Sequence, residues 1–144
     1  MVFIALAVLA VCAIIVLAWI APLQRTSGVR IGFSIGSSQG AEENNTAMEI
    51  IKMNGTFWNE GDITAKNLSA TVIFTETAHN KIVRKTIKEG IDLPPKKEQI
   101  IEFYSEYSRE ITIPKTDVSL MIQFEWNENG HSKTTLTPVH SAQY

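Results

Sequence analysis

Three histidines are the first candidates for chemistry, because histidine serves both as a metal ligand and as a general acid or base near neutral pH. His79 falls in an expected turn, His131 follows an expected hairpin turn, and His140 lies in the C-terminal tail. No two of them have the spacing of a ligand pair on one element. We therefore interpret them as solvated turn residues and predict no metal site.

A series of glutamates recurs at every fourth position after residue 97. Its members are Glu98, Glu102, Glu106 and Glu110. This spacing would line one face of a helix, but the isoleucines and aromatic residues between the glutamates favour a strand. Nothing in the sequence separates the pKa values of two of these carboxyls, as acid–base catalysis requires. The series is interpreted as a solvated strand edge.

Other catalytic and cofactor motifs are missing from the sequence. It contains no Gly-x-Ser-x-Gly elbow, no P-loop and no dinucleotide fingerprint. The only cysteine, Cys12, lies inside an apolar run, so the polar part has no thiol nucleophile and no cysteine metal site. Asp62, near Asn59 and Glu60, resembles a fragment of a calcium loop but lacks the required spacing and terminal glutamate. We predict a protein that is not an enzyme and has no cofactor.

Aromatic residues are better candidates for function. Phe57 and Trp58 are adjacent in an expected strand, so both cannot enter one core. Tyr104 and Tyr107 flank an expected loop. We predict that Trp58, Tyr104 and Tyr107 contact a partner protein, with capping of the sandwich end as the alternative for Trp58. Asn-x-Ser/Thr triplets begin at Asn44, Asn54 and Asn67 and are candidate glycosylation sites.

The first 23 residues contain no charged, amide or hydroxyl side chain. This segment determines where the candidate residues lie relative to the membrane. As a helix this segment would be about 34 Å long, enough to cross a bilayer core of about 30 Å. Trp19 stands where an interfacial aromatic is expected, and Pro22 to Arg25 end the run. A cleaved secretory leader would need a basic start and a shorter core. We predict a retained transmembrane helix over 1–23 and a polar linker over 24–28.

Charge limits the classes of partner. The chain carries 13 basic and 15 acidic residues, interspersed, with a net charge of −2. A field able to hold nucleic acid is therefore not expected, and no small-molecule substrate is evident. Arg25 and Arg30 follow the span, which by the positive-inside rule would favour a cytoplasmic domain. The β-sandwich type of the domain favours the outer side of the membrane, and we expect the domain to be extracytoplasmic.

Short alternating segments separated by turns follow the linker. Strands are expected at 29–35, 48–58, 65–75, 82–87, 99–104, 110–113, 118–126 and 131–137. The Gly/Ser-rich segment 36–46 is expected to be a loop. Turns are expected at 59–62, where Gly61 can supply a positive φ, and at 127–130, where Asn-Gly is a hairpin signal. The alternation is clearest in one segment, with inward Val118, Leu120, Ile122, Phe124 and Trp126.

Seven to eight short strands without an amphipathic helix predict one all-β domain over 29–138, followed by a tail over 139–144. The expected architecture is an antiparallel, immunoglobulin-like β-sandwich behind a transmembrane α-helix.

Two segments resemble a known class of modules. Residues 57–61 read Phe-Trp-Asn-Glu-Gly, and residues 65–72 read Ala-Lys-Asn-Leu-Ser-Ala-Thr-Val. The pair is similar to the Asn-x-Gly…Ala-x-Asn-Val pattern of small immunoglobulin-like, cell-adhesion-related modules on prokaryotic, especially archaeal, cell surfaces. Residues 93–96, Leu-Pro-Pro-Lys, resemble the Leu-Pro-Gly break of that family, with Pro95 in place of glycine. The resemblance implies a strand beginning at Ala65 and implies no catalytic residues.

The sequence therefore predicts a non-catalytic, single-pass membrane protein. Its sandwich would mediate protein–protein binding or envelope assembly, with another membrane or envelope protein, or a second copy, as partner. One alternative is a pilin-like or archaellum-associated filament subunit, with the apolar helix in the filament core and Met1 as a processed terminus. The other is an accessory subunit of a membrane enzyme complex, held through small residues such as Ala5 and Ala13.

Overall fold

The computed structural model describes residues 27–42, 45–76, 79–111 and 117–139. These residues form seven β-strands: β1 (Ile31–Glu42), β2 (Asn45–Asn59), β3 (Ala65–Glu76), β4 (Lys81–Leu93), β5 (Ile100–Glu110), β6 (Val118–Glu128) and β7 (His131–Val139). The described part contains no helix that is long and apolar enough to cross a membrane. The span predicted over 1–23 lies outside the described residues.

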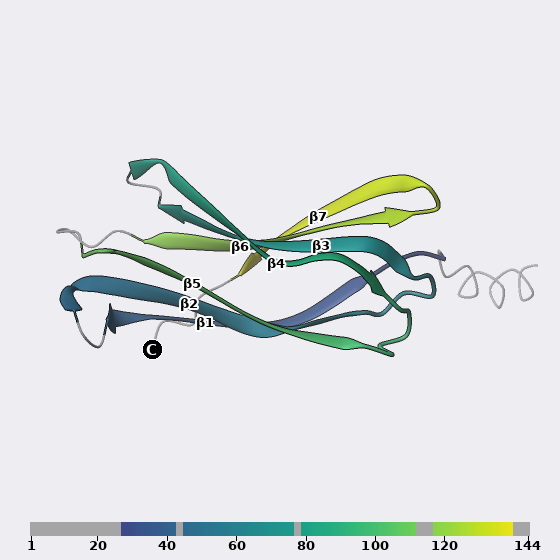
Figure 1. Ribbon diagram of the computed structural model, residues 1–144, viewed down its shortest axis with the longest axis horizontal. Helices are drawn as coiled ribbons and strands as arrows, with labels where there is room; N and C mark the ends of the chain where they lie inside the picture. The colour runs from purple at the N-terminus through teal and green to yellow at the C-terminus, as the bar shows by residue number, and fades with distance from the viewer. Residues whose placement is uncertain (1–26, 43–44, 77–78, 112–116, 140–144) are drawn as a thin grey trace, which may run out of the picture.

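The strands form two antiparallel sheets that pack face to face (Figure 1). One has the order β1-β2-β5 and the other the order β4-β3-β6-β7. Each strand reverses direction relative to its neighbour, so the connections gather at two ends. We call the end with Ser27–Arg30, the turn after Asn59 and the β6–β7 hairpin the entry end. The opposite end, where β1 meets β2 and β3 meets β4, is the far end.

The core lies between the sheets and follows from the alternation of apolar residues. On β3 the inward Leu68, Ala70, Val72 and Phe74 are fully buried. Phe57 on β2 packs against Phe124 on β6, with ring centroids 5.1 Å apart in an edge-on arrangement. Burying both aromatic rings contributes a few kcal/mol of the hydrophobic stabilisation at about 25 cal/mol per Å². The all-β, two-sheet antiparallel prediction is confirmed.

The expected loop over 36–46 is wrong, because β1 continues to Glu42 and β2 begins at Asn45. Register pairs run without interruption from Ile31↔Asn59 to Ala41↔Glu49. Glycine is a poor strand former on its own, but pairing along all of β2 satisfies the backbone hydrogen bonds that a loop would leave to water. Tertiary pairing therefore overrides local propensity here.

The two strands expected at 99–104 and 110–113 are also wrong, because β5 runs unbroken over Ile100–Glu110. Tyr104 and Tyr107 consequently belong to one strand, with no loop between them. Half of the second predicted segment, 112–113, lies outside the described residues. The last strand, β7, ends at Val139.

The two glycine turns behave differently. Asn129 and Gly130 have φ of 52° and 80°, so the Asn-Gly hairpin is confirmed. Gly61 is not among the described residues with positive φ, so the turn does not use the positive φ that this glycine could supply. A Cβ at Gly61 would instead lie 2.0 Å from the Gly28 carbonyl oxygen. Glycine is required there because two backbone segments approach closely.

This close approach fixes the entering chain to the sandwich. The Gly28 amide donates to Asp62 Oδ1 at 2.7 Å, and the Glu60 amide donates to the Arg30 carbonyl oxygen at 2.7 Å. Asn59 is fully buried, and its Oδ1 accepts hydrogen bonds from the amides of Gly61 and Arg30. The predicted linker 24–28 is therefore held at its last two residues. Asp62 therefore has a structural role in this contact.

Candidate functional site

Strand β1 forms one edge of the three-stranded sheet, with β2 beside it on one side only. Of its 12 residues only the last, Glu42, is charged, and none is proline. Within the described residues, the side of β1 away from β2 forms no backbone hydrogen bonds. Its unpaired N–H and C=O groups can therefore bond another strand. The outward positions alternate between two small residue types: Gly32, Ser34, Gly36, Ser38 and Gly40.

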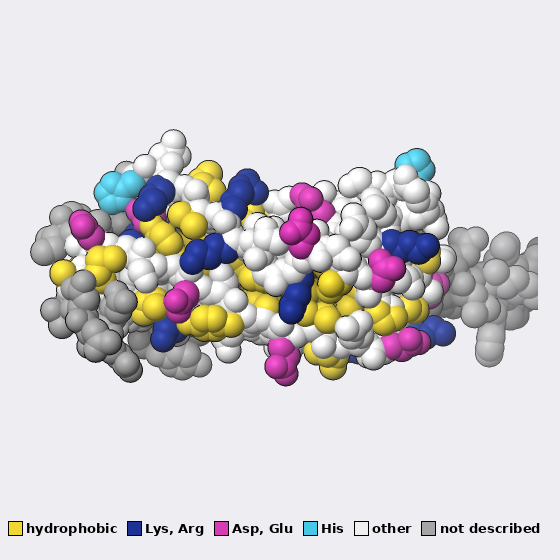
Figure 2. Space-filling view, viewed as in Figure 1, with side chains coloured by type: hydrophobic (Ala, Val, Ile, Leu, Met, Phe, Trp, Pro, Cys, Tyr) yellow, Lys and Arg dark blue, Asp and Glu magenta, His cyan; other side chains and the backbone are white. Residues whose placement is uncertain are grey.

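The other three sheet edges carry the residues that normally discourage strand addition. Strand β4 carries Lys81, Arg84, Lys85 and Lys88. Strand β5 carries Glu102, Glu106, Arg109 and Glu110, and β7 carries Lys133 and Pro138. Figure 2 shows charged side chains of both signs spread over the side where β4 and β5 lie. Among the four sheet edges of the described part, only β1 has neither a charged residue nor proline along almost all of its length.

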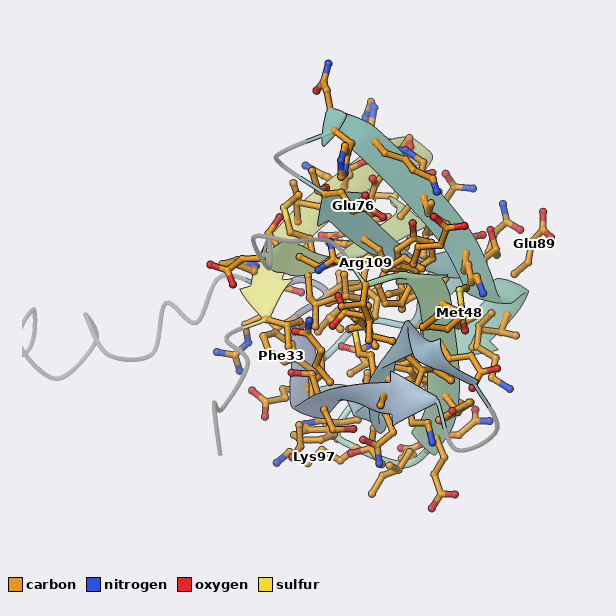
Figure 3. All side chains as sticks on the ribbon, turned by 90° about the vertical axis from the view of Figure 1, so that its left-hand side faces the viewer. Phe33, Met48, Glu76, Glu89, Lys97 and Arg109 are labelled. Atoms are coloured by element: carbon orange, nitrogen blue, oxygen red, sulfur yellow. The ribbon has the colours of Figure 1, made fainter. Side chains whose placement is uncertain are left out.

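Phe33 marks the open side of this edge. It pairs with Phe57 across the sheet and shares its inward face, yet it is 39% exposed while Phe57 is fully buried. The difference arises because Phe33 has a neighbouring strand on one side only. Figure 3 shows Phe33 at one side of the molecule, opposite Glu89 of β4. A strand added beside β1 would cover this ring.

Trp58 lies next to the start of the same edge. A Cβ placed on Gly32 would lie 2.5 Å from Trp58 Nε1, so the indole ring lies over this glycine. Nε1 donates to Glu60 Oε1 at 2.9 Å, and Lys97 Nζ lies 4.9 Å from the ring centroid. The partly exposed indole is therefore fixed in position beside β1, which keeps it a candidate contact residue.

The two predicted tyrosines point in opposite directions, because they stand at positions of opposite phase on β5. Tyr104 faces outward, is 54% exposed and donates to Glu106 at 2.5 Å. Tyr107 faces inward and is 6% exposed, so its expected exposure to a partner is wrong. Its hydroxyl donates to Glu76 between the sheets.

Tyr107 belongs to a buried polar cluster at the far end. Arg109 Nε lies 2.5 Å from Glu49 Oε1, with both side chains at most 5% exposed. Gln39 Nε2 donates to the second oxygen of Glu49 at 2.7 Å. The register places these groups on adjacent rows, because Glu49 pairs with Arg109 and Ile51 pairs with Tyr107. Figure 3 looks onto this end, with Arg109 and Glu76 near its middle.

Glu76 extends the cluster to the other sheet. Burial raises the pKa of the Glu76 carboxyl, but hydrogen bonds from Tyr107 and His79 and the positive charges of Arg109 and Lys81 outweigh burial. The net pKa lies below its ordinary value of 4.5. His79 Nδ1 lies 3.1 Å from Glu76 Oε2, and its side chain is about half exposed. Burial and the bond to Glu76 raise the pKa of Tyr107 above its ordinary value of 10.0.

This chemistry suits a structural connection between the sheets better than catalysis. A general acid at neutral pH needs a carboxyl whose pKa is raised, whereas Glu76 is held ionised. Among the described residues, no group of three or more His, Cys, Asp or Glu side chains could hold a metal ion. His131 is exposed at the β6–β7 turn, and His140 lies outside the described residues. The glutamates of the 98–110 series are exposed, as predicted.

An open depression of about 820 Å³ lies at the entry end. Its polar lining includes Asn67, Asp92, Asn127 and Asn129. Asp92 Oδ1 already accepts the Asn67 amide at 2.9 Å, so it supports the bulged start of β3. Two of the three predicted glycosylation positions are exposed, Asn54 on the outer face of β2 and Asn67 here. Asn44 lies outside the described residues.

Sequence reasoning missed both the β1 edge and the buried cluster. The signal for the edge is the long stretch from Ile31 to Ala41 without charge or proline, part of which local propensity assigns to a loop. The signal for the cluster is the period of two residues along β5. This period places Phe103, Ser105, Tyr107 and Arg109 on the same inward face of a single strand. Glu49 likewise shares its phase with Ile51 and Met53.

Comparison with known proteins gives no family and one informative fold. No family model matches the chain, and no curated protein matches it. A crystal structure from Bordetella pertussis that carries the name ApaA aligns with a TM-score of 0.55 and 13% identity, over 77% of this chain and 90% of that one. A structural-genomics target aligns over 80% and 86% with a TM-score of 0.47 and 14% identity, too low to establish a shared fold. The likeness to the first structure shows a shared β fold and nothing about activity.

Proposed function

We propose that this chain is a non-catalytic, single-pass membrane protein whose sandwich binds a partner by accepting an extended strand beside β1. The observation that supports strand addition most directly is the contrast between edges. Strand β1 is uncharged up to Glu42, whereas β4, β5 and β7 carry lysine, glutamate or proline. Main-chain hydrogen bonds to such an edge supply affinity, and side-chain pockets supply specificity.

The half-exposed ring of Phe33 adds to this proposal. An added strand would bury the remaining apolar surface of that ring, at about 25 cal/mol per Å². Trp58, beside Gly32 on the outer face, offers an aromatic contact to the same incoming strand. Both features lie on or next to β1, so one partner segment could engage the backbone edge and the two rings together.

Membrane attachment and an extracytoplasmic sandwich are further parts of the proposal and rest on the apolar segment 1–23 and on the domain type. We further propose that the sandwich is immunoglobulin-like. Seven antiparallel strands in a three-stranded and a four-stranded sheet suit that class. Here β4 pairs with β3, whereas the fourth strand of constant-type domains lies beside the fifth.

The test compares two matched serine-to-lysine variants of the full chain in mild detergent. Ser34→Lys adds a charge to the outward face of β1, and Ser108→Lys adds the same charge to the outward face of β5. Co-purifying proteins are identified by mass spectrometry, the number of copies of the chain is obtained from the mass of the complex, and unfolding midpoints establish that both variants fold. We expect the stoichiometric partner to be retained by Ser108→Lys and lost with Ser34→Lys. Equal retention by both variants, or long homopolymers in place of a discrete complex, would contradict the proposal.

A further inference from the structure

We infer that the strand accepted by β1 is the β1 strand of a second copy of this chain, in antiparallel register about Gly36. The inference rests on the proposed function, since it names the occupant of the edge. It follows from the order of residues along β1 and from the charge of each position.

The outward face of β1 reads the same in both directions. Its residues are Gly32, Ser34, Gly36, Ser38 and Gly40. The two-fold axis would be perpendicular to the sheet and would pass between the Gly36 residues of the two copies. Each residue of β1 then stands opposite the residue that lies equally far from Gly36 in the second copy. Serine then faces serine across the two strands, and glycine faces glycine. Closed two-fold pairing of this kind is the commonest form of homo-oligomer.

The inward face is compatible with the same register. Ile31 would face Ala41 of the second copy, Phe33 would face Gln39, and Ile35 would face Ser37. No pair in this register brings like charges together, because residues 31–41 are uncharged and Glu42 would stand opposite Arg30 of the second copy. The apolar stem of Gln39 would cover the exposed part of Phe33. A heterologous strand would need its own pattern of small residues, whereas a second copy already has one.

Glycine at two outward positions has a steric consequence. The Trp58 ring lies over Gly32, and Gly40 of the second copy would stand opposite that glycine. A Cβ at Gly40 would meet no atom within 4 Å in the single chain. Because Gly40 has no side chain, the second copy would place no side chain against the Trp58 ring at this position.

Disulfide trapping tests the register in full-length chain that carries Cys12→Ala, so that no native thiol competes. Gly36→Cys puts two thiols on the axis, where opposite Cα atoms lie about 4.5–5.5 Å apart, within disulfide range. Ser34→Cys alone puts its two thiols about 13 Å apart along the strands. In a mixture of the two variants Ser34→Cys and Ser38→Cys, the thiol at position 34 of one copy stands opposite the thiol at position 38 of the other. We expect rapid dimer from Gly36→Cys and from the mixture, and little from Ser34→Cys alone.

Charge pairs test the same register without thiols. Ser34→Lys/Ser38→Glu sets opposite charges across both strands, and Ser34→Glu/Ser38→Glu sets like charges there. Both variants carry the same Ser38→Glu change beside Lys52 within the chain, so only the sign at position 34 differs. We expect the first to dimerise at least about tenfold more tightly than the second, measured by analytical ultracentrifugation in detergent.

The outcomes separate this inference from the proposed function. Equal trapping of all cysteine variants, or equal dimerisation of the two charge variants, would overturn the self-pairing. If a different protein were still lost from Ser34→Lys and retained by Ser108→Lys, strand addition would stand with another occupant. If both tests failed, the β1 edge would have no binding role.

Discussion

The buried ion pair at the far end offers the sharpest test of the energetics. Arg109 and Glu49 are both at most 5% exposed, so the charge of Glu49 is compensated by Arg109 and not by solvent. Replacing Arg109 by methionine keeps the apolar stem but removes the positive charge beside the Glu49 carboxyl, whose second oxygen is bonded to the neutral Gln39 amide. Removing one member of a buried pair costs about 3–5 kcal/mol, a large part of the roughly 5–15 kcal/mol that holds a typical domain folded.

The double variant decides between a structural ion pair and a simple loss of packing. Arg109→Met combined with Glu49→Leu removes both charges and restores apolar contact, and such replacements are often neutral or stabilising. We expect each single variant to lose about 3–5 kcal/mol and the double variant to lose less than either. The measurement is urea unfolding of the full chain in mild detergent, followed by circular dichroism.

A control comes from the exposed pair at the entry end. Lys97 Nζ and Glu60 Oε1 lie 3.3 Å apart with side chains 54% and 40% exposed, so Lys97→Met is expected to leave the midpoint close to that of the unaltered chain. Losses in the double variant that equal the sum of the two single losses would refute the reasoning, because the two charges would then be independent.

Three further outcomes follow from contacts elsewhere in the sandwich. Gly55→Ala should cost about 1–3 kcal/mol because its Cβ would lie 2.2 Å from a backbone carbonyl of β1, whereas Gly40→Ala should cost nothing, both by urea unfolding. Since the Glu76 pKa is lowered below 4.5 on folding, its contribution is present above that pH and is lost as the pH falls further. Glu76→Gln should therefore flatten the fall in melting temperature between about pH 5 and 3. Asn59→Ala removes an amide with four backbone partners and should cost about 2–4 kcal/mol, with faster amide exchange at Arg30.

The alternating segments were predictable because burial on one face imposes a period of two residues. The strand that became β6 shows this most clearly, since Leu120, Ile122, Phe124 and Trp126 are all buried as expected. The Asn129–Gly130 turn was also predictable, because few residue pairs adopt two successive positive φ angles. These features depend on neighbouring residues in the chain alone.

The candidate site was harder to predict because it depends on what lies opposite each residue. Gly36 and Ser38 have low strand propensity, and only their pairing with Asn54 and Lys52 makes them part of β1. Arg109 lies among the exposed glutamates of β5, and the local sequence does not mark it as buried because its partner Glu49 is 60 positions away. Neither long-range pairing leaves a signal in the local pattern.

The fixed entry of the chain gives self-pairing a consequence for the whole protein. In antiparallel register about Gly36, Ile31 of each copy faces Ala41 of the other, so the two entry ends lie at opposite ends of the paired strands, about 33 Å apart. Ser27–Arg30 are bonded to Asp62 and Asn59, and only residues 24–26 separate them from the predicted span. Three residues reach about 10 Å, too little to return along the strand. Two anchored copies paired in this way would therefore join opposing membranes or lie flat on one. A filament, in which all apolar helices run in one direction, cannot contain this pairing, so trapping through Gly36→Cys would count against the filament alternative as well.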